Sequence, residues 1–332
     1  MTGGARPRLA AGARQCVSHT KKGSVPKDFT ASSRRPMIRS AQFSTQTDLL
    51  RPRLEPAGDG KMWIDPHFRN RLCQEGMGGF EQVMGKIDGQ CLRELRIREN
   101  WYLPPVRTGN DKCGLYLKKH RTRNLATVIR ALLGFGPGQT AARVEVNNVD
   151  CLSADGIAVM RVVAYGEKMC RGGLVESFLL TEELAGYTNL RRLLTTYFAP
   201  GRLADPAIRH ELKALVRAVA ALARRFHQLG YNHRDFYCCH FLVKRTGYGR
   251  FDIRLIDLQR VQRRKLLRRR WIVKDLAQLA WSAPRESIGC KQRVAFIKHY
   301  LGVRKLTAEH KRLIRSILCK QRLMRWRLGA QP

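Results

Sequence analysis

Two carboxylates, Asp235 and Asp257, could carry the chemistry of this chain. Asp235 follows His233 and Arg234 in a His-Arg-Asp triplet, and Asp257 ends a later apolar run. Phosphoryl transfer needs two carboxylates in this order. The first accepts the proton of the acceptor hydroxyl, and the second holds the metal ion on the nucleotide. The pattern therefore predicts a kinase of protein-kinase-like fold that acts on a small molecule or a glycolipid.

A long helix is expected to present the His-Arg-Asp loop. Asp205 suits the N-cap of this helix, and Pro206 suits its first helical position. Apolar residues then recur at helical spacing until Gly230, which suits the C-terminal cap. The helix would bury its apolar stripe in the core and give the loop a rigid base.

Three residues upstream are candidates for the nucleotide site. Lys118 ends a strand-like segment, from which an ammonium group could reach the α- and β-phosphates. Glu145 lies in a predicted helix over residues 140–152, where a kinase glutamate pairs with that lysine. Glu182 lies in the apolar strand-like segment 177–184, which suits the hinge that meets the adenine edge.

These assignments have alternatives. A slip of one residue would put Lys119 in place of Lys118, and helical glutamates are more often solvated than paired. Residues 80–98 are predicted to form strand-like pieces broken by glycines. They contain no G-x-G-x-x-G motif, so the phosphate lid has no assigned residues.

The net charge of +37 implies an anionic partner. A nucleic acid, an anionic membrane surface and a phosphorylated substrate all fit that charge. No helix-turn-helix, zinc finger or aromatic RNA-binding signature accompanies it, so a specific nucleic-acid partner is not expected. The densely basic run 259–270 suits the approach of an acidic acceptor, although a solvated charged turn is an equal alternative.

The cysteines and the apolar segments indicate a reduced cytoplasmic protein. The ten cysteines include no C-x-x-C pair. Cys238 and Cys239, with His233 and His240 nearby, lack the spacing of a tetrahedral zinc site. No apolar run approaches the roughly 20 residues that span a bilayer, and the N-terminus lacks the apolar region of a secretory signal.

Three sequence blocks, taken together and in order, resemble the lipopolysaccharide core kinase (Kdo/WaaP-type) family. The blocks are His233-Arg234-Asp235-Phe236-Tyr237-x-Cys239-His240-Phe241-Leu242, Leu255-Ile256-Asp257-Leu258-x-Arg260-Val261-Gln262 and Arg270-Trp271-Ile272-Val273-Lys274-Asp275-Leu276. The resemblance is strongest over residues 225–300. It implies an α+β, bilobal protein-kinase-like fold with a β-rich N-lobe and a mainly helical C-lobe. It also implies ATP-dependent phosphorylation of a heptose or Kdo hydroxyl in the lipopolysaccharide inner core.

The same resemblance implies roles for the site residues. Asp235 would be the catalytic base and Asp257 the Mg²⁺ ligand, while Lys118 would bind the phosphates of ATP and Glu145 would orient Lys118. Arg234 is assigned to the catalytic group as part of the triplet. A further buried carboxylate, that of Asp275, is expected to bind the backbone of the His-Arg-Asp loop.

His240 stands where protein kinases place an asparagine metal ligand after the catalytic aspartate. Imidazole is a poor ligand for Mg²⁺, which prefers oxygen ligands. His240 is therefore expected either to hydrogen-bond a phosphate or to hold Asp235 in place. The family shares this histidine, so it does not indicate an inactive enzyme.

The predicted organisation is a disordered basic tail over 1–60, an N-lobe over 61–184 and a C-lobe over 185–328. Lipopolysaccharide, or another anionic glycolipid, is the expected acceptor. The basic surface is expected to hold the protein peripherally on the cytoplasmic face of the inner membrane. Two rivals remain open. One is a kinase with a protein Ser/Thr or another sugar as acceptor, and the other is a basic pseudokinase that only binds.

Overall fold

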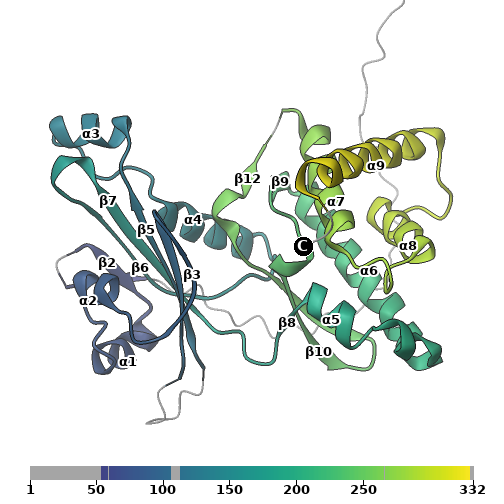
Figure 1. Ribbon diagram of the computed structural model, residues 1–332, viewed down its shortest axis with the longest axis horizontal. Coiled ribbons are helices and arrows are strands. Elements are labelled where there is room, and N and C mark those ends of the chain that lie inside the picture. The colour runs from purple at the N-terminus through teal and green to yellow at the C-terminus, as the bar shows by residue number, and fades with distance from the viewer. Residues whose placement is uncertain (1–53, 59, 106–112, 265, 330–332) are drawn as a thin grey trace, which may run out of the picture. The chain divides into compact units, whose positions relative to one another are not determined.

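The computed structural model describes residues 54–58, 60–105, 113–264 and 266–329. An antiparallel sheet is formed by the first half of the described chain, and the second half is mainly helical (Figure 1). This arrangement confirms the predicted α+β class. The predicted boundary at 184/185 stays a prediction, and most of the predicted N-terminal tail lies outside the described residues.

The seven-stranded sheet is antiparallel throughout. In spatial order its strands are β1 Glu55–Ala57, β2 Met62–Ile64, β6 Val162–Met169, β7 Val175–Glu182, β5 Leu115–Thr122, β4 Arg98–Leu103 and β3 Gln90–Leu95. β1 lies within the predicted 1–60 tail, and it pairs with β2 along its whole length, so residues 55–57 belong to the sheet.

Six helical segments lie between the strands of this sheet along the described chain. They are η1 Pro66–Phe68, α1 Arg69–Gln74, α2 Phe80–Gly85, α3 Leu125–Leu132, α4 Ala141–Ala154 and η2 Arg171–Gly173. The predicted strand-like character of residues 80–98 is wrong at its start, where α2 lies. Phe80, Val83 and Met84 follow helical spacing, and all three are buried. The helix predicted over 140–152 is confirmed by α4.

The second half of the chain is built around α6, Pro206–Gln228. Its N-cap is the predicted Asp205, whose carboxylate accepts the amide of Ala207 at 2.7 Å. Gly230 follows the helix with φ of 91°, a conformation that glycine adopts without strain. The other elements are β8 Thr188–Asn189, α5 Leu190–Thr196, η3 Pro200–Ala204, β9 Tyr231–Asn232, η4 Cys238–His240, β10 Phe241–Gly247, β11 Arg250–Leu255, η5 Leu258–Arg260, β12 Gln262–Arg263, α7 Arg268–Ser282, α8 Cys290–Leu301 and α9 Ala308–Leu328.

The larger hydrophobic core surrounds the base of the His-Arg-Asp loop. Phe236, directly after Asp235, is fully buried, and its ring centroid lies 5.7 Å from that of Phe226 on α6 and 4.8 Å from that of Phe241 on β10. This core also includes apolar residues of α4 and β6. Within the described ranges, no helix combines the length and apolar character needed to cross a membrane.

Candidate active site

An ion-paired cluster joins β5, α4 and the turn after β11. The Nζ atom of Lys118 lies 2.7 Å from Oε1 of Glu145 and 3.1 Å from Oδ1 of Asp257. Glu145 is 1% exposed, whereas Asp257 is 28% exposed and can be reached from solvent. The structure thus brings together three residues that the sequence had separated by up to 139 positions.

The alternation along β5 selects Lys118 over Lys119. A second, smaller hydrophobic core includes Phe80 and Phe178. Leu115, Leu117 and Lys119 share the face of β5 that packs on this core, and Lys118 lies on the opposite face. Lys119 is 1% exposed, and its Nζ donates to the backbone carbonyl of Lys86 at 2.6 Å. The lysine that meets Glu145 and Asp257 is therefore the one predicted.

The turn that carries Asp257 is held by α4. Asp257 adopts φ of 57° and ψ of 57°, a left-handed conformation that few non-glycine residues adopt. The next amide, that of Leu258, donates to Oε1 of Glu145 at 3.2 Å. Nδ2 of Asn148, one turn further along α4, donates to the Leu258 carbonyl at 2.7 Å. Glu145 therefore positions both Lys118 and the backbone beside Asp257.

Contacts within the cluster keep Lys118 and Asp257 charged. Burial alone would lower the pKa of Lys118, but the carboxylates of Glu145 and Asp257 outweigh it and raise that pKa. Burial also opposes ionisation of Asp257. The positive charges of Lys118, His240 and Arg98 prevail and hold the pKa of Asp257 well below its usual range. Asp257 is therefore an ionised carboxylate, the form that binds a metal ion.

The His-Arg-Asp loop is anchored by Asp275 on α7. The fully buried carboxylate of Asp275 accepts the amide of His233 at 2.8 Å and the amide of Arg234 at 3.0 Å. Arg234 has φ of 70°, so its backbone conformation needs such support. The expectation that Asp275 binds this loop is confirmed.

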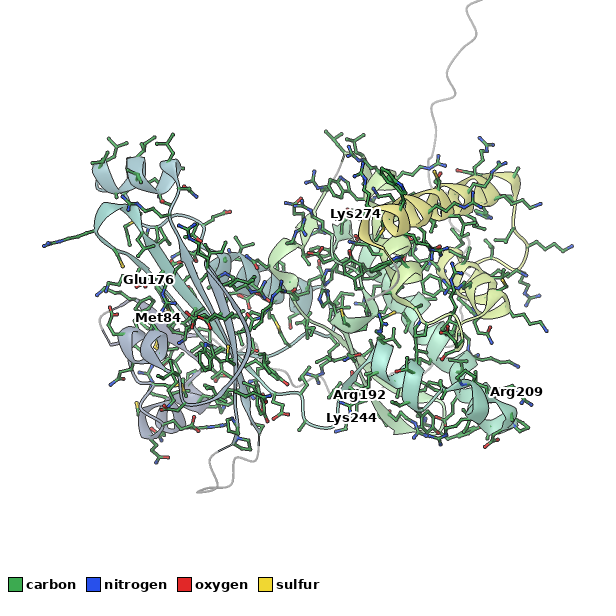
Figure 2. The ribbon with its side chains drawn as sticks, in the orientation of Figure 1. Met84, Glu176, Arg192, Arg209, Lys244 and Lys274 are labelled. Atoms are coloured by element: carbon green, nitrogen blue, oxygen red, sulfur yellow. The ribbon has the colours of Figure 1, made fainter. Side chains whose placement is uncertain are left out.

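Other polar residues of α7 hold the same loop, and the sequence reasoning missed them. The side-chain amide of Gln278 accepts the amide of Phe236 at 3.1 Å and donates to the carbonyl of Arg234 at 2.9 Å. Ser282 accepts the amide of Cys238 at 2.8 Å. Lys274, labelled in Figure 2, also donates to the Arg234 carbonyl. The available signal was the spacing of Lys274, Gln278 and Ser282, which are four residues apart and therefore lie on one side of a helix.

Asp235 is paired with Arg260 of η5. Nη1 of Arg260 lies 2.9 Å and 3.0 Å from the two carboxylate oxygens of Asp235. Arg260 is 51% exposed and Asp235 is 19% exposed, so the pair sits at the surface of the site. An exposed pair of this kind contributes little to stability. Arg260 can therefore leave Asp235 and pair with another anion with little loss of stability.

His240 connects the two carboxylate loops. Its Nδ1 lies 2.7 Å from the backbone carbonyl of Asp235, and its Nε2 lies 3.7 Å from Oδ2 of Asp257. Burial lowers the pKa of His240, but contacts with Cys239, the Asp235 carbonyl and Asp257 together raise it. Of the two expected roles, these contacts favour holding the Asp235 loop in place. The contact with a phosphate stays a prediction.

The side-chain contacts described for Arg234 and Glu182 are with residues outside the Lys118–Glu145–Asp257 cluster. The guanidinium of Arg234 lies over the ring of Trp271, 5.3 Å from its centroid. Glu182 is the last residue of β7, and its amide donates to the carbonyl of Arg161 at 3.1 Å. Its carboxylate lies 3.7 Å from Nη1 of Arg161. The catalytic role of Arg234 and the adenine contact at Glu182 stay predictions.

The donor set suits Mg²⁺ bound together with a nucleotide. Among the described residues, no three His, Cys, Asp or Glu side chains are grouped closely enough to hold a metal by themselves. Mg²⁺ needs less from the protein, since one or two carboxylates plus substrate phosphates and water complete its octahedron. Asp257, ionised and partly exposed, can supply that carboxylate.

Comparison with known proteins gives a consistent result. The lipopolysaccharide kinase (Kdo/WaaP) family matches residues 88–300. The chain is 34% identical over 228 residues to the lipopolysaccharide core heptose(I) kinase WaaP of Pseudomonas aeruginosa, a match that covers 68% of this chain and 81% of that protein. The heptose(I) kinase WaaP of Escherichia coli K12 is also 34% identical, over 233 residues, with 69% and 83% covered. A solved structure titled "WaaP in complex with acyl carrier protein" is 29% identical with a TM-score of 0.58, and the match covers 81% of this chain and 99% of that one.

Proposed function

Because the chain belongs to the lipopolysaccharide kinase (Kdo/WaaP) family, we propose that it transfers a phosphoryl group from ATP to a heptose hydroxyl of the lipopolysaccharide inner core. The observation that carries the proposal is the cluster of Lys118, Glu145 and Asp257, with Asp235 on a loop that α7 anchors beside it. This cluster contains the charged groups that phosphoryl transfer uses.

Each residue has a distinct task in the proposed reaction. Lys118, oriented by Glu145, binds the α- and β-phosphates as a point charge. Asp257 would hold Mg²⁺, and that ion would neutralise charge on the phosphates of ATP. Asp235 accepts the proton of the heptose hydroxyl while that oxygen attacks the γ-phosphorus. The bond between the γ-phosphorus and the β,γ-bridging oxygen breaks, and ADP leaves. His240 fixes the position of the Asp235 backbone relative to the Asp257 carboxylate, because it contacts both.

The test is phosphate transfer from radiolabelled ATP–Mg²⁺ to a lipopolysaccharide extract, with Asp235→Asn beside the wild type. We expect label in the core heptose with the wild type only. Label in protein alone would support a protein kinase. Transfer to a different purified sugar but not to the extract would mean another acceptor. Failure of the folded protein to bind ATP would support the pseudokinase.

We also propose that the segment between Arg263 and Arg270 touches the membrane that holds the acceptor. Leu266 and Leu267 are 81% and 70% exposed, and arginines flank them on both sides. Exposed apolar side chains within a basic segment suit an interface with anionic lipids. The segment lies in the chain between Arg260 and Lys274 of α7, which both line the pocket beside Asp235.

Co-sedimentation with vesicles that contain anionic lipid tests this proposal. Leu266→Ser with Leu267→Ser should reduce binding several-fold. The matched control is Leu125→Ser with Leu132→Ser, which removes two leucines of α3 that are 75% and 81% exposed. An equal loss in both variants, or a loss in neither, would contradict a specific role for the 263–270 segment.

A further inference from the structure

A pocket opens beside the carboxylate of Asp235, with a volume of about 240 Å³. One wall comes from the loop and α7 through Tyr237, Lys274 and Gln278, and Arg260 borders it as well. The opposite wall comes from α9. Pockets that enclose whole drug-sized ligands measure roughly 300–1,000 Å³. This pocket is therefore suited to a single sugar ring or its substituent rather than to an entire glycolipid.

The helix α9 is fixed against α7 by a buried row of residues. Ile317 and Met324 are 4% and 8% exposed and belong to the larger core. Gln321 lies between them on the same face, and its Nε2 donates to the carbonyl of Ala280 at 3.1 Å. Figure 1 shows α9, in yellow, alongside α7. The face of α9 next to this row is thus held in a defined position.

That neighbouring face lines the pocket. Lys320, Leu323 and Arg327 recur at spacings of three and four residues, so they share one side of the helix. Among the residues that the structure describes, neither Lys320 nor Arg327 forms an ion pair with a carboxylate. Their charges are consequently available to a ligand.

The charge balance of the pocket favours an anion. Lys320 and Arg327 join Lys274 and Arg260, so four cationic side chains surround the single carboxylate of Asp235. Arg260 already pairs with that carboxylate, and Lys274 is bonded to backbone. The positive charges of Lys320 and Arg327 on α9 are therefore not balanced by a carboxylate in the pocket. Leu323 offers an apolar surface to the C–H face of a sugar.

We propose that this pocket is a subsite for an anionic group, a carboxylate or a phosphate, on the acceptor close to the hydroxyl that is phosphorylated. The proposal rests on the proposed function, since it places the acceptor sugar against Asp235. An anion held by Lys320 and Arg327 in a pocket of about 240 Å³ must belong to the reacting sugar or to its direct neighbour. The matched family region ends at residue 300, before α9 begins at Ala308.

Steady-state kinetics of the full-length protein test the subsite. Lys320→Gln with Arg327→Gln should raise the ratio of the acceptor KM to the ATP KM by at least about tenfold, because two charge-assisted contacts to the acceptor are lost. The matched control is Lys311→Gln with Arg322→Gln, which removes the same two charges from exposed positions of α9 outside the pocket. We expect no change of that ratio in the control.

An equal rise in both variants would overturn the proposal, because general electrostatic attraction would then explain it. No rise in the Lys320→Gln, Arg327→Gln variant would overturn it as well.

Ligand-observed NMR provides a readout that does not need activity. Glucuronic acid and glucose 6-phosphate, but not glucose, should show saturation transfer from the wild type, and the Lys320→Gln, Arg327→Gln variant should lose that signal. The two acidic sugars distinguish a carboxylate site from a phosphate site. Equal signals for glucose and the acidic sugars would refute an anion subsite. If the anions bind as expected but lipopolysaccharide is not phosphorylated, the proposed function fails and the subsite stands.

Discussion

Replacing Asp275 by asparagine should disconnect the His-Arg-Asp loop from α7. The Asp275 carboxylate is fully buried and accepts two backbone amides, at 2.8 Å and 3.0 Å. Asparagine keeps one acceptor oxygen and turns an NH₂ donor toward the other amide. One charge-assisted hydrogen bond, about 1.5–3 kcal/mol, is lost, and one buried amide is left unpaired at about 1–3 kcal/mol. The free energy of unfolding should therefore fall by about 2.5–6 kcal/mol.

The same substitution should affect catalysis through position. Arg234 is held at φ of 70° by these bonds, so the loop can relax and move Asp235 away from the acceptor. A displacement of about 1 Å can cost roughly 100-fold in kcat. ATP affinity should persist, because the contacts of Lys118 with Glu145 do not involve Asp275. Urea unfolding, phosphate transfer and ATP binding are the three measurements.

An exposed carboxylate serves as the control. Asp88→Asn changes a side chain that is 76% exposed and should alter the free energy of unfolding by less than about 0.5 kcal/mol. If Asp275→Asn unfolds at the wild-type urea concentration and keeps the wild-type kcat, the loop does not depend on this carboxylate and the reasoning is refuted.

Three further outcomes follow from the site. Glu145→Gln should raise the ATP KM by about tenfold or more, because Lys118 loses its buried ionic partner; an unchanged ATP KM in steady-state assays would contradict the assigned role. Burial and the nearby His240 lower the pKa of His233 from 6.5 to about 4. The neutral form of His233 therefore contributes stability that is complete above pH 6.5 and is lost as the pH falls toward 4. Urea unfolding over that pH range should show that the free energy of unfolding declines less steeply with falling pH in His233→Gln than in the wild type. Parallel curves for the two proteins would exclude His233 as the cause. Transfer to lipopolysaccharide should fall as salt rises from about 0.1 M to 1 M, where the Debye length shrinks from about 10 Å to 3 Å, and constant activity would rule out attraction by the net charge of +37.

Sequence alone predicted the features whose signals lie within a few residues. Asp205 and Gly230 predicted both ends of α6, because caps and turn conformations depend on local hydrogen bonds. The spacing of Asp235 and Asp257, supported by the family resemblance, identified the two carboxylate loops. The alternation along β5 indicated a strand at Lys118, although it took the structure to exclude Lys119.

Tertiary structure decided which distant residues meet. The contact of Arg260 with Asp235 spans 25 positions, and the bonds from the loop to Gln278 and Ser282 span 42 and 44. Such pairs depend on how α7 packs beside the loop, and no local propensity records that packing. The same holds for α9, whose basic residues look like an ordinary solvated surface in the sequence. Only the burial of Ile317 and Met324 against the core turns one face of that helix toward Asp235.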